Sequence, residues 1–298
     1  MSCRTDVVEI SKRLDATSII DRVKESGFTI VHGLSPTIEA FEQFSDQCGI
    51  TFSPYRGRVI GARTLVGSAD SGIVTVNEGT GAIGWHAEAS FTPLWPDFLF
   101  FFCVNSPRDG GETLLVDGVD VYDSLCEQAQ QRARQVQLFH TREARFDVPD
   151  EIAAFLGLFK VNSRSELEAV FSNIPVREDE QWSHLTRADA VKYVYSHPLV
   201  RRGKWSTRLG ICGFLPELPM IGDDVLLPDD LYKSISDAAT SYRYLHRWRD
   251  GEVLIIDNTR MMHARNAVTD QARKIVLRIG NERHSDCPKS ATRIARGP

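Results

Sequence analysis

The chain has 298 residues, of which 42% are hydrophobic and 25% are charged, as is usual for a globular protein with a sizeable core. Its formal net charge of −5 excludes the broad basic surface that nucleic-acid binding requires. The first residues lack the pattern of a secretion signal, and the longest apolar run, Phe98–Val104, is too short to cross a bilayer. We therefore expect no nucleic-acid partner and no membrane partner.

The cysteines indicate a reducing compartment. Six of them are scattered along the chain, and none forms a C-x-x-C pair. We therefore expect a cytoplasmic protein.

The first half of the chain predicts two helices, several short strands and one longer helix. A helix is expected over about 18–25, then a strand at GFTIVHGL and a second helix at IEAFEQFSDQCG, which Gly49 would close. Strands are expected at FLFFFCVNSP and, after the turn RDGG, at ETLLVDG. Residues 119–140 predict a long helix.

The second half returns to strands after a different middle segment. Residues 145–190 show short helical patterns and no clear strand, so we interpret them as a helical insertion that covers a site. Strands are expected at KYVYSHPLV and TRLGICGF, a helix at DDLYKSISDAATSYRYLHRW, and strands at EVLIIDNTRMMHAR and ARKIVLRIG.

This order of elements predicts a mainly β protein with flanking helices. A parallel α/β sheet fits poorly because strand–helix–strand alternation is not sustained, whereas strands on both sides of an insertion fit a jelly roll, the double-stranded β-helix. We expect one jelly-roll domain over residues 1–298, with the insertion at about 145–190 and a polar tail at about 281–298.

The stretch GWHAEASF, residues 84–91, suggests a metal site. His86 and Glu88 are two residues apart, so in a strand they would share a face. With 8 histidines and 40 acidic residues, about one such pair is expected by chance, so a third ligand is needed. His263, in IIDNTRMMHAR, is the best candidate, although a core histidine is the alternative. Two histidines and one carboxylate form the facial triad that holds ferrous iron.

A ferrous site of this kind needs a co-substrate. If it is 2-oxoglutarate, the distal carboxylate requires a cationic anchor, for which the planar fork of arginine is suited. Arg278, in IVLRIG on the next strand, is the candidate, and Thr113, in GGETLL, can add a hydroxyl hydrogen bond. The alternatives are a surface arginine and a threonine that merely favours a strand.

Four further residues are weaker candidates. Arg273 would face the 2-oxoglutarate or the substrate, or else only the surface, and Arg265 is a candidate for a substrate carboxylate. Asp257 and Asn258 are expected to shape the turn before His263, with support of the metal ligands as the alternative.

The blocks WHAE, GGET, DNTRMMHAR and LR, together with HPLVR, resemble the taurine dioxygenase and clavaminate synthase-like superfamily of iron- and 2-oxoglutarate-dependent oxygenases. The resemblance covers most of the chain and implies that His86, Glu88 and His263 bind iron, while Thr113 and Arg278 anchor 2-oxoglutarate. Many taurine dioxygenase-type members have Asp at the position of Glu88. The glutamate of this chain resembles the clavaminate synthase branch instead. A carboxylate there also argues against the related halogenases, which have a small residue.

The resemblance implies a dioxygenase that uses Fe(II), 2-oxoglutarate and O2 and releases succinate and CO2. We expect it to remove hydrogen from an unactivated C–H bond of a small molecule, an amino acid or amino-acid-derived natural-product intermediate, and to hydroxylate it. Desaturation or ring closure is the alternative with the same cofactors. A non-catalytic metal- or ligand-binding jelly roll and a zinc hydrolase are alternatives of other classes. A carrier-tethered substrate and a homo-oligomer stay open.

Overall fold

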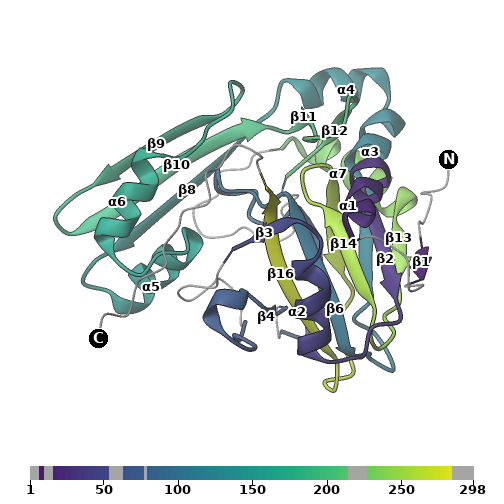
Figure 1. Cartoon of the computed structure of the whole chain (residues 1–298). Coiled ribbons are helices and arrows are strands. Elements are labelled where there is room, and N and C mark those ends of the chain that lie inside the picture. The colour runs from purple at the N-terminus through teal and green to yellow at the C-terminus, as the bar shows by residue number, and fades with distance from the viewer. Residues whose placement is uncertain (1–6, 10–15, 54–62, 77–78, 214–226, 284–298) are drawn as a thin grey trace, which may run out of the picture.

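The computed structural model describes residues 7–9, 16–53, 63–76, 79–213 and 227–283. Two sheets, antiparallel except for β1, form its centre (Figure 1). The larger has the order β1 (Val7–Glu9), β2 (Phe28–His32), β14 (Val253–Asp257), β6 (Phe98–Asn105), β16 (Lys274–Glu282) and β3 (Ile50–Phe52), with β4 (Val74–Thr75) also paired to β16. The smaller has the order β13 (Tyr244–His246), β7 (Thr113–Asp117), β15 (Met261–Arg265) and β5 (Ile83–His86). The expected mainly β, jelly-roll class is confirmed.

The core between the sheets follows from strand alternation. In β6, Leu99 and Phe101 pack in the cluster between the sheets, whereas Phe98, Phe100 and Phe102 pack in a second cluster on the outer face. Because β6 is buried on both faces, its sequence is a continuous apolar run rather than an alternating one.

Helices cover the outer faces of both sheets. The larger sheet packs against α1 (Ala16–Ser26) and α2 (Ile38–Asp46), as Figure 1 shows. The smaller packs against α3 (Gly118–Ser124), α4 (Glu127–Arg134) and α7 (Asp229–Tyr242). The two N-terminal helices lie close to their predicted positions, but α2 ends at Asp46 with Gln47 as its cap, not Gly49.

The prediction of one helix over residues 119–140 is wrong. The backbone of Leu125 and of Cys126 is extended, which separates α3 from α4. Residues after Val136 enter β8 (Gln137–Arg145), since β10 (Ala190–Pro198) offers hydrogen-bonding partners along the whole length of β8. Tertiary pairing overrides the local helical pattern there.

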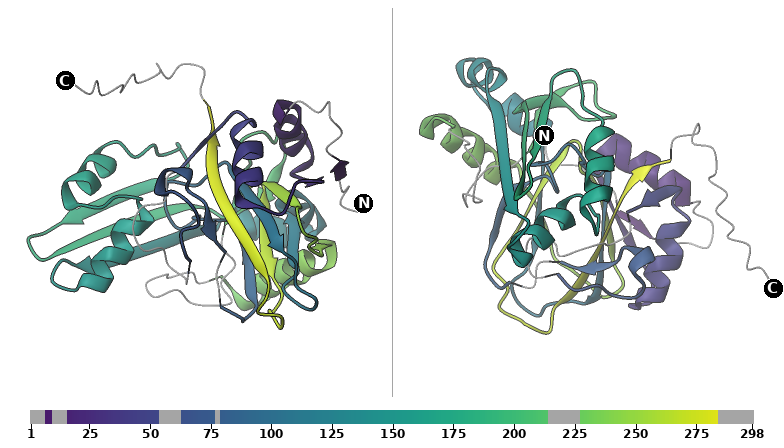
Figure 2. Two further views of the ribbon diagram at one scale, coloured as in Figure 1. Left: turned by 60° about the horizontal axis from the view of Figure 1, so that its bottom comes forward. Right: turned by 90° about the vertical axis from the view of Figure 1, so that its left-hand side faces the viewer.

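The insertion contains a sheet as well as helices. Between β8 and β10 lie α5 (Pro149–Leu158), α6 (Arg164–Ser172) and β9 (Gln181–Thr186), and the strand order is β8-β10-β9. The expectation of an insertion without clear strands is therefore wrong for residues 181–186. In Figures 1 and 2 this sheet and its two helices extend to one side of the two central sheets.

A few short elements complete the described structure. They are the 3-10 turn η1 (Ala69–Ser71) and the paired strands β11 (Val200–Arg202) and β12 (Leu209–Ile211). In the expected C-terminal tail, residues 281–282 belong to β16, and residues 284–298 lie outside the described residues. Within the described ranges, no helix is both long and apolar enough to cross a bilayer.

The packing between the sheets makes a direct stability prediction. Leu254 is fully buried in the inter-sheet cluster, whereas Leu245 is 37% exposed on β13. Leu254→Ala should lower the free energy of unfolding by about 2–5 kcal/mol through lost burial and a cavity, and Leu245→Ala by less than about 1 kcal/mol. Urea denaturation of both variants checks this, and equal losses would contradict the sheet-on-sheet core.

Candidate functional site

Three predicted residues meet between the sheets. His86, Glu88 and His263 each offer one ligand atom, and these atoms lie within 4.8 Å of one another. His86 ends β5, and its Cα partner across the antiparallel pair is His263 on β15, with ring centroids 4.1 Å apart. The structure thus brings together all three candidate metal ligands.

Glu88 reaches this point from a turn rather than from a strand. β5 ends at His86, and Glu88 lies in the turn that follows, next to Ala89 with a φ of 59°. The expectation that His86 and Glu88 share a strand face is therefore wrong. Other contacts must fix Glu88, because the sheet does not.

Asn258 supplies those contacts from the turn between β14 and β15. Its Oδ1 accepts the Glu88 backbone N–H at 2.7 Å, and its Nδ2 donates to the carbonyl oxygens of Glu88 and Pro96, each at 3.0 Å. Asp257 shapes the same turn, since its Oδ1 accepts from the Thr259 amide and hydroxyl, and burial raises its pKa to about 7. Both alternatives from the sequence thus apply, one to each residue.

Arg63 contacts the Glu88 carboxylate directly. One guanidinium nitrogen lies 3.1 Å and 3.2 Å from the two carboxylate oxygens. Burial alone would raise the pKa of Glu88, but the positive charge of Arg63 and interactions with His86 and His263 lower it to about 2. Sequence analysis missed Arg63, because it belongs to no motif.

The donor set fits a ferrous ion. Burial lowers the pKa of His86 and of His263, so both imidazoles are neutral beside an ionised carboxylate. The His86 Nδ1 lies 2.9 Å from the Gly84 carbonyl oxygen and donates to it, which leaves Nε2 as the ligand atom. His263 Nδ1 is buried and has no hydrogen-bond partner within the described part of the chain. Two neutral imidazoles and a carboxylate are a typical set for non-haem Fe(II).

Thr113 and Arg273 line the same cavity as the three ligands. The Thr113 hydroxyl oxygen accepts from Trp248 Nε1 at 3.1 Å, so its proton remains available for a ligand. Arg273 is half-buried, and its Nε, which is buried, has no hydrogen-bond partner among the described residues. Burial, and then repulsion by Arg265, lowers the pKa of Arg273 to about 10, and a partly desolvated cation of this kind favours a bound anion.

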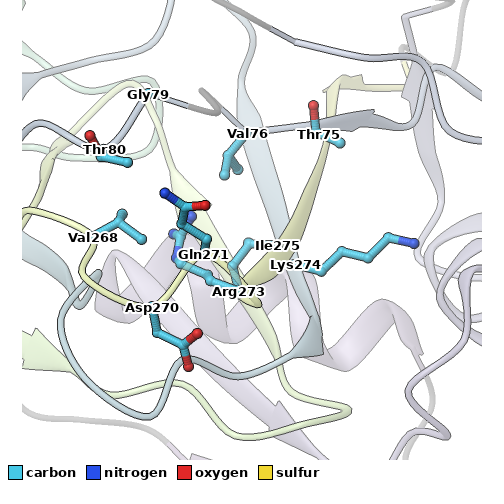
Figure 3. A pocket seen from close by; sticks show the side chains of 10 residues that line it. All are labelled: Thr75, Val76, Gly79, Thr80, Val268, Asp270, Gln271, Arg273, Lys274 and Ile275. Atoms are coloured by element: carbon cyan, nitrogen blue, oxygen red, sulfur yellow. The ribbon is translucent and has the colours of Figure 1, made fainter.

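A neighbouring cavity of about 480 Å³ also reaches Arg273. Figure 3 shows Arg273 between the segment at Val76–Thr80 and the loop at Val268–Gln271, with Lys274 directed away from it. A Cβ on Gly111 would lie 2.9 Å from Arg273 Cδ, so only glycine leaves room for the arginine. The GGET block therefore contributes both this space and Thr113.

Arg278 does not reach the site, so its assignment as the 2-oxoglutarate anchor is corrected. It pairs in register with Phe100, on the face of β16 that turns towards α2. Its guanidinium donates to the Ser71 carbonyl at 2.6 Å, to Ser45 Oγ at 2.7 Å and to Asp46 at 2.6 Å. Arg278 therefore ties α2 and η1 to the sheet.

Arg265 lies inside the cavity but is engaged in holding the chain. One guanidinium nitrogen donates to the carbonyl oxygens of Gly79 and Gly81, at 2.5 Å and 2.6 Å. It thus fixes the segment that leads into β5, and these contacts favour a positioning role over the binding of a substrate carboxylate.

Comparison with known proteins decides the family. The model of the taurine catabolism dioxygenase TauD, TfdA family matches residues 5–279. The chain belongs to this family. The expected superfamily is thereby confirmed. Oxygenases of the family use Fe(II), 2-oxoglutarate and O2, which are the cofactors that the sequence predicted.

Individual relatives are distant. The chain is 25% identical over 204 residues to the dapdiamide synthesis protein DdaC of Enterobacter agglomerans. This match covers 60% of each of the two chains. The chain is 22% identical over 205 residues to pentalenolactone F synthase of Streptomyces arenae, over 66% of this chain and 60% of that relative. The match thus spans about 60% of the length of these curated relatives.

Solved structures share the fold. PvcB, an Fe, alpha-ketoglutarate dependent oxygenase from an isonitrile synthetic pathway, superposes with a TM-score of 0.55 at 16% identity, over 92% of this chain and 82% of that one. AAD-2 in complex with Mn(II) and N-oxalylglycine superposes with a TM-score of 0.54 at 17% identity, over 94% of this chain and 97% of that one.

The Asn258 contacts predict a positioning effect. Asn258→Ala removes three hydrogen bonds that fix Glu88 and Pro96, so the affinity for Mn(II) should fall about 10–100-fold although no ligand is changed. Titration of the metal-free protein by calorimetry measures this. Asn173→Ala, on the exposed surface after α6, is the control, and unchanged affinity in a folded Asn258→Ala variant would contradict the role.

Proposed function

We propose that this protein is an Fe(II)- and 2-oxoglutarate-dependent oxygenase that removes hydrogen from an unactivated C–H bond of a small molecule and hydroxylates it. The observation that carries the proposal is one cavity lined by His86, Glu88, His263, Thr113 and Arg273, whose Nε has no hydrogen-bond partner among the described residues. We also propose that the chain is a single jelly-roll domain with an insertion.

His86, Glu88 and His263 would hold the iron, leaving further coordination positions for co-substrate and O2. When bound, the iron and 2-oxoglutarate would supply the oxidation by O2 that breaks the C–H bond, with succinate and CO2 as the other products. Arg63 and Asn258 keep Glu88 ionised and in place. The ring of Phe101 packs against the ring of His263, with centroids 5.6 Å apart. It would limit the access of water to the metal from that side.

Thr113 and Arg273 would anchor the distal carboxylate of 2-oxoglutarate. A guanidinium binds a carboxylate through two parallel N–H donors, and the threonine hydroxyl adds a third. Arg273 takes the role that the sequence suggested for Arg278, because it lies in the metal cavity and Arg278 does not.

The roles named for two similar proteins support a substrate from natural-product synthesis. DdaC is a dapdiamide synthesis protein, and PvcB belongs to an isonitrile synthetic pathway. We propose an amino acid or an amino-acid-derived intermediate as the substrate. Desaturation or ring closure with the same cofactors is the alternative, which analysis of the product distinguishes from hydroxylation.

A non-catalytic metal-binding jelly roll is the competing function of another class. Such a protein does not need an arginine and a threonine hydroxyl in the cavity that holds its metal. The position of Arg273 in the metal cavity therefore favours the oxygenase.

Anaerobic addition of Fe(II) and then 2-oxoglutarate tests the proposal by the visible charge-transfer absorption of the chelate. Wild-type protein should give the absorption, and His263→Ala should abolish it. Arg273→Ala should weaken 2-oxoglutarate binding by at least about 30-fold, because truncating one partner of a buried charge pair costs about 2 kcal/mol or more.

Arg278→Ala is the matched control. It should keep the 2-oxoglutarate affinity and lower the free energy of unfolding by about 2 kcal/mol, since it removes the hydrogen bonds to Ser45 and Ser71. If folded, iron-replete wild-type protein lacks the absorption, the oxygenase proposal is wrong. Lost affinity in Arg278→Ala alone would return the anchor to Arg278.

A further inference from the structure

A second cavity adjoins the metal cavity, and Arg63 and Glu88 line both of them. Most of its remaining wall is apolar, with Phe91 after the metal-binding turn and Leu277 of β16 on the side of the central sheets. The insertion closes it with the end of α5 and with Lys160. A molecule in this cavity would therefore lie against Glu88 on one side and against the insertion on the other.

The half-buried Lys160 contributes a positive charge to this apolar cavity. Among the described residues, its ammonium group forms no hydrogen bond and no ion pair. Burial lowers the pKa of Lys160 to about 8, against the weaker opposing effect of Glu88. A cation in such surroundings favours a bound anion.

The backbone at Lys160 suits glycine better than lysine. Lys160 follows the C-cap of α5 with a φ of 56°, and its N–H donates to the Gly157 carbonyl while that of Val161 donates to Leu156. These two bonds form the Schellman motif, in which glycine usually takes this position. The other described non-glycine residue with positive φ, Ala89, lines the same cavity. Such strain is typical of functional sites, which supports a role for the side chain of Lys160.

We propose that Lys160 binds the carboxylate of the substrate, whose apolar body fills this cavity next to Glu88. The inference rests on the proposed oxygenase function and names the substrate class. A carboxylate fits better than a phosphate, because Arg63 is already paired with Glu88, which leaves Lys160 as the one other cation among the described lining residues. The C–H bond that reacts then belongs to the apolar body, at a distance from the carboxylate.

Matched ligands test the charge preference. The protein is loaded anaerobically with Mn(II) and 2-oxoglutarate, which occupies Arg273, and hexanoate or hexanamide is titrated by calorimetry. Hexanoate should bind at least about tenfold more tightly than hexanamide. Lys160→Gln should remove the difference, Lys160→Arg should keep it, and Lys192→Gln, on β10 outside the cavity, should leave it unchanged.

Lys160→Gly separates ligand binding from folding. Glycine suits the left-handed backbone, so this variant should melt at the wild-type temperature or higher while losing the preference for hexanoate. A preference that survives in Lys160→Gln or Lys160→Gly would overturn the proposal. Tighter binding of hexyl phosphate than of hexanoate would overturn the assignment to a carboxylate.

Chemical labelling distinguishes this inference from the oxygenase proposal. In metal-free protein, acetic anhydride at pH 8 should label Lys160, and hexanoate but not hexanamide should protect it, as peptide mass spectrometry would measure. Protection in a protein that fails to bind Mn(II) and 2-oxoglutarate would remove the oxygenase proposal and leave the carboxylate site. Normal loading without protection would overturn the carboxylate site alone.

Discussion

The site depends on the register in which β15 lies between β5 and β7. His263 pairs with His86 on one side, and Arg265 pairs with Thr113 on the other. Residues of β15 alternate, so Met262 packs under the helices of the smaller sheet while His263 faces the cavity. A slip by one residue would bury the histidine among the helices and expose Met262 to the cavity. The apolar packing of Met262 therefore positions the metal ligand.

Glu88 cannot depend on that register, because it lies beyond the end of β5. The same turn that starts β15 supplies Asn258, which holds the backbone of Glu88 from both its N–H and its carbonyl. This turn thus determines where β15 begins, and so where His263 lies. It also determines where Glu88 lies. Arg63 then fixes the carboxylate oxygens, so the backbone and the side chain of Glu88 are positioned separately.

The sequence predicted what local patterns determine. Short spacing revealed His86 and Glu88, the end of an apolar strand revealed His263, and the GGET block revealed Thr113. The sequence favoured Arg278 over Arg273 as the 2-oxoglutarate anchor. Because β16 is buried on both faces, its apolar run shows no alternation that would indicate on which face Arg278 lies. The helix over residues 119–140 and the missed strand β9 failed for another reason. Pairing with β10 decides the structure of residues 137–140 and of β9, and no local pattern reports that partner.

The central sheets and the turn after β5 carry the candidate metal ligands, whereas the insertion lines the neighbouring cavity with the end of α5 and Lys160. Arg201 of β11 holds the insertion in its orientation. It forms a buried ion pair at 3.0 Å with Glu180, just before β9, and its Cζ lies 4.5 Å from the centroid of the Trp95 ring. Tyr193 of β10 also donates its hydroxyl to the Phe91 carbonyl at 3.0 Å. Buried ion pairs add little net stability but can specify geometry. Phe91 and Trp95 lie three and seven residues after Glu88, so these contacts connect the insertion to the segment that carries this candidate metal ligand. On the proposed function, they would set the distance between Lys160 and the metal, and hence the length of substrate that fits.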